Sequence, residues 1–133
     1  MKSYTDLEQS KKLAEILPLE SADMCWTNHC YGAIRSSMTI SAKTVDEYKS
    51  LLDRFNGSAS IDVFYPAWSL AALLNLCPTI NRKQPILTRG KLTRLWYCYY
   101  EDEIDTQTYD NPIDACYEMI IRLHELKMLL LWE

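Results

Sequence analysis

The segment that most constrains the fold of this chain is residues 111–130, because its polar side chains form one narrow stripe. The stripe recurs at helical spacing and consists of Asp114, Glu118, Arg122 and Glu125. Asn111 is a favourable N-cap and Pro112 a favourable first helical residue, so we expect the helix to begin there. Almost all other residues of the segment are apolar. A helix with so little polar surface needs a sheet on one side and a second helix on another.

The chain supplies strand formers immediately before this helix. Residues 95–100 are Leu-Trp-Tyr-Cys-Tyr-Tyr, and apolar or β-branched residues alternate with polar ones over 103–109. We expect a short strand at 86–88 and a second strand at 91–101, which contains this run, with a turn at Arg89-Gly90 between them and a second turn at Asp102. The pattern predicts an antiparallel meander of about three strands.

Two helices are expected in the first half of the chain. The first covers residues 7–17, after a capping box in which Thr5 is the N-cap, and ends at Pro18. The second covers residues 45–55, after a capping box in which Thr44 is the N-cap, and ends at an Asn-Gly pair.

A third helix is predicted over residues 67–77, with Pro66 in its first turn and apolar residues on nearly every side. Residues 60–65 are expected to be extended, because the residue before a proline avoids the helical region. Apolar and polar residues alternate over 38–41, which is typical of a short strand. Residues 18–37 show no period apart from one possible short strand, and their placement stays open.

Length and composition indicate one globular domain over residues 1–133. The chain is 48% hydrophobic and 24% charged, which is typical of a protein with a buried core. The predicted fold class is therefore α+β: an antiparallel sheet of about three strands packed with three to four helices, with the C-terminal helix on the sheet.

The sequence predicts a cytoplasmic protein. Its charged N-terminus lacks the apolar stretch of a signal peptide, and no apolar run reaches the roughly 18 residues of a membrane span. The five cysteines are odd in number and irregular in spacing, which favours reduced thiols. The apolar tail at 128–132 either packs in the core as the last helical turn or forms an exposed apolar patch that binds a partner subunit.

Three segments in order carry a resemblance. Residues 4–13 are YTDLEQSKKL, residues 65–74 are YPAWSLAALL, and residues 110–120 are DNPIDACYEMI. This trio resembles a family of small uncharacterised proteins of gut Bacteroidetes, their prophages and their mobile elements. Members share an EQSKKL start, a P-x-WSL-x-ALL centre and an N-P-x-D-A helix, and residues 25–60 diverge. The resemblance implies a shared fold and a mobile-element source, and it carries no catalytic residue over to this chain.

Cys25, His29 and Cys30 are the nearest approach to a metal cluster in the sequence. A zinc site needs three or four ligands, usually in two close pairs, and here there is only one close group. We therefore expect no metal and no cofactor, with a small cysteine- or metal-dependent protein as an alternative. A pair of thiols able to form a disulfide is another interpretation. No thiol has an evident neighbouring base, so we predict that the chain is not an enzyme.

Charge is segregated along the second half of the chain, although the net charge is only −4. No acidic residue occurs from 63 to 100, whereas residues 101–118 contain seven acidic residues and no basic ones. The basic strand at 82–94, with Arg89, Lys91 and Arg94, could bind single-stranded nucleic acid beside aromatic residues. We favour pairing of opposite charges across neighbouring strands, because the acidic stretch would repel phosphate.

The aromatic residues suggest the function that we favour from sequence. Nine tyrosines and four tryptophans against two phenylalanines are typical of a core rim or a binding surface. We predict a small non-catalytic binding protein with an unidentified protein partner, a second copy of the chain being one candidate, and no membrane association. The predicted surface consists of Tyr65, Trp68, Trp96, Tyr97 and Tyr99. Trp68, taken by itself, is best interpreted as structural, because its ring can fill a helix–sheet junction and its N–H can reach a loop carbonyl.

Overall fold

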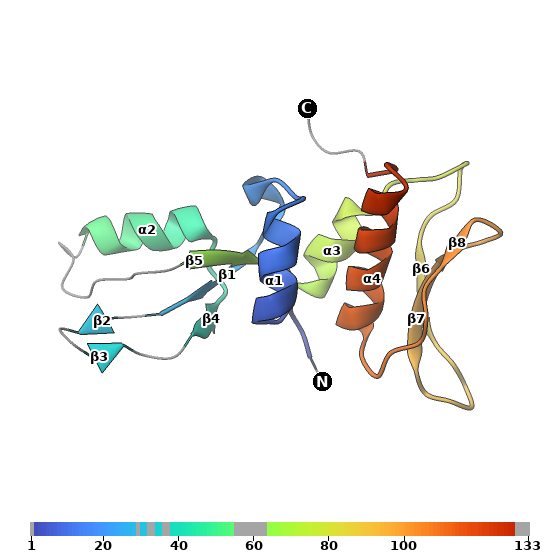
Figure 1. Cartoon of the computed structure of the whole chain (residues 1–133), viewed down its shortest axis with the longest axis horizontal. Coiled ribbons are helices and arrows are strands. Elements are labelled where there is room, and N and C mark those ends of the chain that lie inside the picture. Colours follow the sequence, from blue (N-terminus) through green and yellow to red (C-terminus); the bar gives the residue numbers. More distant parts are fainter. Residues whose placement is uncertain (1, 29, 32–33, 36–37, 55–63, 130–133) are drawn as a thin grey trace. The chain divides into compact units, whose positions relative to one another are not determined.

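The computed structural model describes residues 2–28, 30–31, 34–35, 38–54 and 64–129 (Figure 1). The chain divides into two compact units, which are described separately. The N-terminal unit is Asp6–Trp68, and the C-terminal unit is Met1–Thr5 together with Ser69–Glu133. Each unit combines helices with a three-stranded antiparallel sheet, which confirms the α+β class. The single domain expected from chain length stays a prediction.

The N-terminal unit is built around a sheet in the order β4-β1-β5 (Figure 1). Its elements are α1 (Leu7–Ala14), a 3-10 helix (Leu19–Ser21), β1 (Met24–Thr27), β2 (Cys30–Tyr31), β3 (Ile34–Arg35), β4 (Thr39–Ser41), α2 (Val45–Arg54) and β5 (Phe64–Ala67). Helices α1 and α2 both contact β5, and β2 pairs with β3 in a separate two-stranded ribbon. The predicted strand at 38–41 is thus confirmed as β4.

Two predicted helix starts in this region are wrong. The N-cap of α1 is Asp6, whose carboxylate accepts from the Gln9 backbone N–H at 2.8 Å, while Thr5 is buried. Pro66 lies in β5, opposite Cys25, and not in the first turn of a helix. Since β5 is an edge strand, a residue without an N–H can be accommodated there. The second capping box is confirmed, because the Glu47 backbone N–H donates to Thr44 Oγ1 at 3.2 Å.

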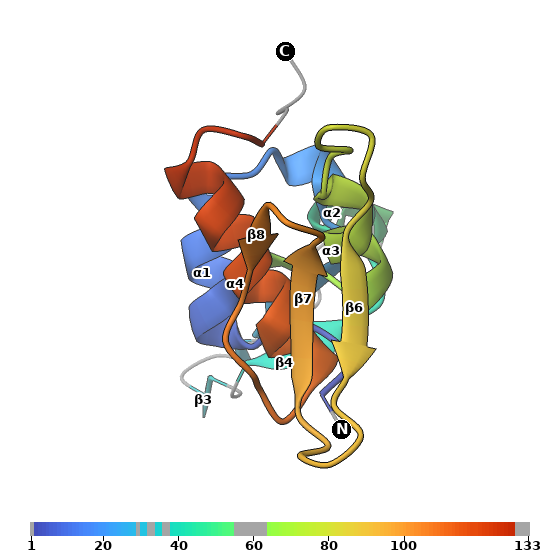
Figure 2. The same ribbon diagram turned by 90° about the vertical axis from the view of Figure 1, so that its right-hand side faces the viewer.

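The C-terminal unit has the architecture that the sequence predicted for it. Its elements are α3 (Leu70–Leu76), β6 (Ile86–Arg89), β7 (Trp96–Tyr100), β8 (Ile104–Asp105) and α4 (Pro112–Glu125). Strand β7 lies between β6 and β8, and α4 packs on β7 and β6 and against α3 (Figure 2). The C-terminal helix therefore has a sheet on one side and a helix on another, as its narrow polar stripe requires.

The ends of the helices follow local capping chemistry. Asn111 caps α4 by accepting the Asp114 backbone N–H at 2.9 Å, and Pro112 is the first helical residue, as predicted. Helix α3 begins only at Leu70, because the Ser69 hydroxyl accepts the Ala72 backbone N–H at 3.2 Å. The Ser69 side chain thus satisfies a helical N–H that would otherwise lack a partner, as an N-cap residue does.

One hydrophobic cluster holds the sheet to α4. Its buried members are Ile80, Cys98, Tyr100, Ala115, Met119 and Leu123. Met128 and Leu129 also pack against this cluster, so the beginning of the apolar tail belongs to the core. Residues 130–133, the rest of that tail, lie outside the described residues.

Candidate binding surface on the outer face of the β6–β7–β8 sheet

Strand β7 directs its side chains to two different environments. Cys98 and Tyr100 are buried on the inner face, which packs on α4, and the Tyr100 hydroxyl donates to the Pro78 carbonyl at 2.7 Å. Tyr97 and Tyr99 are only half-buried. Because successive residues of a strand point to opposite faces, these two tyrosines lie on the outer face of the sheet, away from α4.

The two outer tyrosines form a stacked pair. Their ring centroids are 5.6 Å apart and the ring planes differ by 25°. On the neighbouring strand β6, Thr88 is opposite Tyr97 and Ile86 is opposite Tyr99. Ile86 retains 39% of its surface exposed. The outer face thus presents an aromatic pair with an aliphatic side chain beside it.

The pairing of β8 with β7 is interrupted beside these tyrosines. The Thr106 backbone N–H donates to the Cys98 carbonyl at 3.0 Å, but the Cys98 N–H donates to the Thr106 hydroxyl, also at 3.0 Å. Regular backbone pairing resumes at Trp96, which exchanges two backbone hydrogen bonds with Tyr109. A side chain therefore replaces the backbone acceptor at this point, as occurs where a strand is bulged.

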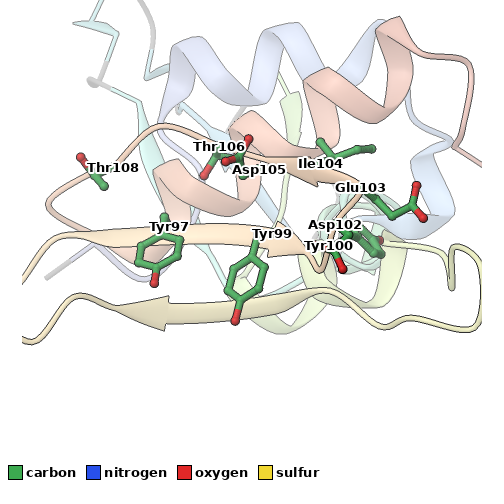
Figure 3. A pocket seen from close by; sticks show the side chains of 9 residues that line it. All are labelled: Tyr97, Tyr99, Tyr100, Asp102, Glu103, Ile104, Asp105, Thr106 and Thr108. Atoms are coloured by element: carbon green, nitrogen blue, oxygen red, sulfur yellow. The ribbon is translucent and has the colours of Figure 1, made fainter.

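A pocket of about 590 Å³ lies at this part of the sheet (Figure 3). In Figure 3, Tyr97 and Tyr99 project from β7 in the same direction. The pocket lining also contains three carboxylates, Asp102, Glu103 and Asp105, and no lysine or arginine. The pocket therefore combines an aromatic surface with a negatively charged rim.

The three carboxylates differ in whether they already have a hydrogen-bond or ion-pair partner within the protein. Glu103 accepts a hydrogen bond from the Asn81 side-chain amide at 2.8 Å and lies 4.0 Å from the Lys83 ammonium. Asp102 and Asp105 are exposed, and neither forms an ion pair with any residue that the structure describes. The rim thus keeps two carboxylates free for an external partner.

The other three residues of the predicted binding surface lie elsewhere. Trp68 has no exposed surface and donates from its indole N–H to the Ser21 hydroxyl at 2.9 Å, so it is a core residue. Trp96 packs against the hydrophobic cluster on the inner face of the sheet. Tyr65 belongs to the N-terminal unit, where Lys11 lies 5.1 Å from its ring centroid. The structural interpretation of Trp68 is thus confirmed. Sequence could not place Trp96, because its burial depends on which face of β7 meets a helix.

The basic residues named for the nucleic-acid alternative lie at the opposite end of β7 from the carboxylates. Arg89 is exposed at the end of β6, and Lys91 and Arg94 are exposed in the connection to β7. The predicted pairing of opposite charges across neighbouring strands is not found among the described ion pairs, since Lys83 and Glu103 lie before β6 and β8, which are separated by β7. The predicted strand at 91–101 begins only at Trp96, so Lys91 and Arg94 lie in a connection that is longer than the predicted Arg89-Gly90 turn.

The cysteines whose side chains the structure describes are buried in the core or pack against it. Cys25 is a buried free thiol, and burial followed by the charge of Glu47 raises its pKa. Burial also raises the pKa of Cys77 to about 12, which makes it a poor nucleophile at neutral pH. The predicted group of Cys25, His29 and Cys30 lies only in part within the described residues, since His29 and the Cys30 side chain are outside them. Among the described residues, no three potential ligands are grouped to hold a metal ion.

Sequence reasoning missed the carboxylates and threonines of the pocket as site residues. The available signal was the acidic run that directly follows the aromatic strand. Comparisons with family models, with curated proteins and with solved structures found no match to this chain. In the described ranges, no helix is long and apolar enough to cross a membrane.

Proposed function

We propose that this chain is a non-catalytic binding protein whose working surface is the outer face of the β6–β7–β8 sheet. The observation that carries the proposal is the stacked, half-buried pair of Tyr97 and Tyr99 at a pocket of about 590 Å³. Tyrosine offers a large contact area with few rotatable bonds, so it loses little entropy when a partner orders it. A volume of this size is within the range of ligand-binding pockets.

Binding is favoured over catalysis by the kinds of side chain that line the pocket. They provide aromatic surface, carboxylates and hydroxyls, but no cysteine or histidine that could act as a nucleophile or its base. The proposed partner is a protein of the cytoplasm, and a second copy of this chain is one candidate. The resemblance of the three sequence segments supports a mobile element of Bacteroidetes as the source.

The test is affinity purification of the tagged chain from cells of its source organism, with quantitative mass spectrometry. The double variant Tyr97→Ser/Tyr99→Ser removes the aromatic pair without placing a new charge on the sheet. We expect it to recover the partner about tenfold less than the unmodified chain, since truncation of aromatic interface residues commonly costs more than 1 kcal/mol.

The matched control is Leu92→Ser, which changes a residue that is 98% exposed in the β6–β7 connection. This variant should recover the partner as well as the unmodified chain does. Circular dichroism spectra must be the same for all three proteins. Equal recovery with and without the tyrosine pair would contradict the proposed surface.

A further inference from the structure

We infer that the pocket beside Tyr97 and Tyr99 recognises a cationic side chain of the partner, and specifically the guanidinium of an arginine in a peptide segment. This inference rests on the proposed function and names the chemistry of the partner. It joins two features of one pocket: the aromatic pair and the free carboxylates at its rim. Each feature is weak by itself, and their combination is selective.

The aromatic pair provides a site for a planar cation. The face of an aromatic ring is electron-rich and attracts a cation placed within about 6 Å of the ring centroid. Tyr97 and Tyr99 stack on each other, so together they form one continuous aromatic surface along β7. A guanidinium is planar and weakly hydrated, so it stacks on such a surface at less cost than an ammonium does.

The rim provides the charge that a guanidinium complements. Asp102, Glu103 and Asp105 line the pocket, and no lysine or arginine does. Only Glu103 has a cationic neighbour among the described residues, Lys83 at 4.0 Å. Asp102 and Asp105 are exposed acceptors, and a carboxylate can accept two parallel N–H donors from one guanidinium.

Two other classes of ligand fit this pocket less well. A divalent metal ion needs at least three ligands close together, and no such group occurs among the described residues. A phosphate-bearing ligand would meet the rim carboxylates, while the exposed Arg89, Lys91 and Arg94 lie toward the other end of β7. The negative charge of the rim thus favours a cationic ligand. The aromatic pair favours an organic cation over a metal ion.

The experiment is a nuclear magnetic resonance titration of the full-length chain with two peptides that differ only in charge. The first alternates glycine with arginine and has blocked ends, and the second replaces each arginine with citrulline, its neutral near-isostere. We expect the arginine peptide to shift the ring signals of Tyr97 and Tyr99 and the amide signals near Asp105. Its affinity should exceed that of the citrulline peptide by about tenfold and fall as salt is added.

The variants Asp102→Asn and Asp105→Asn, combined, test the carboxylates without removing the pocket. Asn tolerates the positive backbone φ of 59° at Asp102, so the turn should be kept. The double variant should weaken binding of the arginine peptide to the level of the citrulline peptide. Asp46→Asn, an exposed change in the first turn of α2, is the matched control and should have no effect.

Equal affinity for the two peptides, or no shift with either peptide at low salt, would overturn the cationic partner. Both results are distinguishable from failure of the proposed function. In those cases the Tyr97→Ser/Tyr99→Ser variant could still lose its partner in the affinity purification. Conversely, if that variant keeps its partner, the proposed working surface itself is wrong.

Discussion

The reassignment of Trp68 from the binding surface to the core makes a quantitative prediction about stability. Its ring has no exposed surface, its indole N–H donates to the Ser21 hydroxyl at 2.9 Å, and that hydroxyl donates in turn to the Pro18 carbonyl at 2.6 Å. The three groups form a short chain of hydrogen bonds that connects the 3-10 helix with the residue after β5. Replacing either Trp68 or Ser21 should therefore destabilise the protein without touching the candidate binding surface.

The magnitudes follow from the volume removed and the hydrogen bond lost. Trp68→Phe deletes roughly 40 Å³, which at about 24 cal/mol per Å³ costs about 1 kcal/mol. Loss of the hydrogen bond adds about 1 kcal/mol, giving about 2 kcal/mol in total. Ser21→Ala leaves the buried indole N–H unpaired and should cost about 1.5 kcal/mol. Because both changes remove the same hydrogen bond, the double variant should cost about 1 kcal/mol less than their sum.

The assay is urea unfolding followed by far-ultraviolet circular dichroism, which does not depend on the tryptophan that is replaced. Tyr97→Phe is the control, since it removes a hydroxyl from the outer face and should change the free energy of unfolding by less than about 0.5 kcal/mol. If Ser21→Ala were equally neutral, or if the two core changes were simply additive, the hydrogen bond to Trp68 would not contribute to stability. The inference that the indole N–H of Trp68 forms a stabilising hydrogen bond with Ser21 would then be refuted.

Three further predictions concern the C-terminal unit. Asn111→Ala removes the side chain that caps α4 and should cost about 1 kcal/mol in urea unfolding, whereas Asn111→Ser keeps a capping oxygen and should cost less; equal losses would contradict the capping role. Thr106→Val leaves the Cys98 N–H without its acceptor and should cost about 1–2 kcal/mol and speed exchange of that amide with solvent, whereas Thr106→Ser should do neither. Burial raises the pKa of Cys77 to about 12 from the ordinary 9.0, so the unfolded chain loses this proton first. Stability should therefore be fully present below about pH 9 and fall between about pH 9 and 12, with a slope of at most about 1.4 kcal/mol per pH unit from this thiol. Urea unfolding of Cys77→Ala below and above pH 9 checks this, and an unchanged pH dependence would contradict it.

Local sequence signals were sufficient to predict which helices and strands form the C-terminal unit, although not where each of them begins. The polar stripe of α4, its Asn-Pro start and the strand formers of β7 are local signals, because helix and strand periods and caps depend on neighbouring residues. Those signals were enough to predict a C-terminal helix on an antiparallel sheet. The start of α1 was misplaced because Thr5 and Asp6 can each offer a capping side chain. The start of α3 was misplaced because Pro66 suits an edge strand as well as a first helical turn, and only the final backbone path selects between them.

Which aromatic residues are accessible depends on packing between segments that are distant in the sequence. Tyr97, Cys98, Tyr99 and Tyr100 all favour strands, and their alternation indicates two faces without saying which face α4 covers. The sheet register places Tyr97 and Tyr99 on the outer face, while burial removes Trp68 from the predicted surface. The carboxylates of the pocket come from a turn and a short strand that follow β7, and the fold of that segment brings them beside the tyrosines. Sequence thus determined what each segment forms, and packing determined which side chains remain available to a partner.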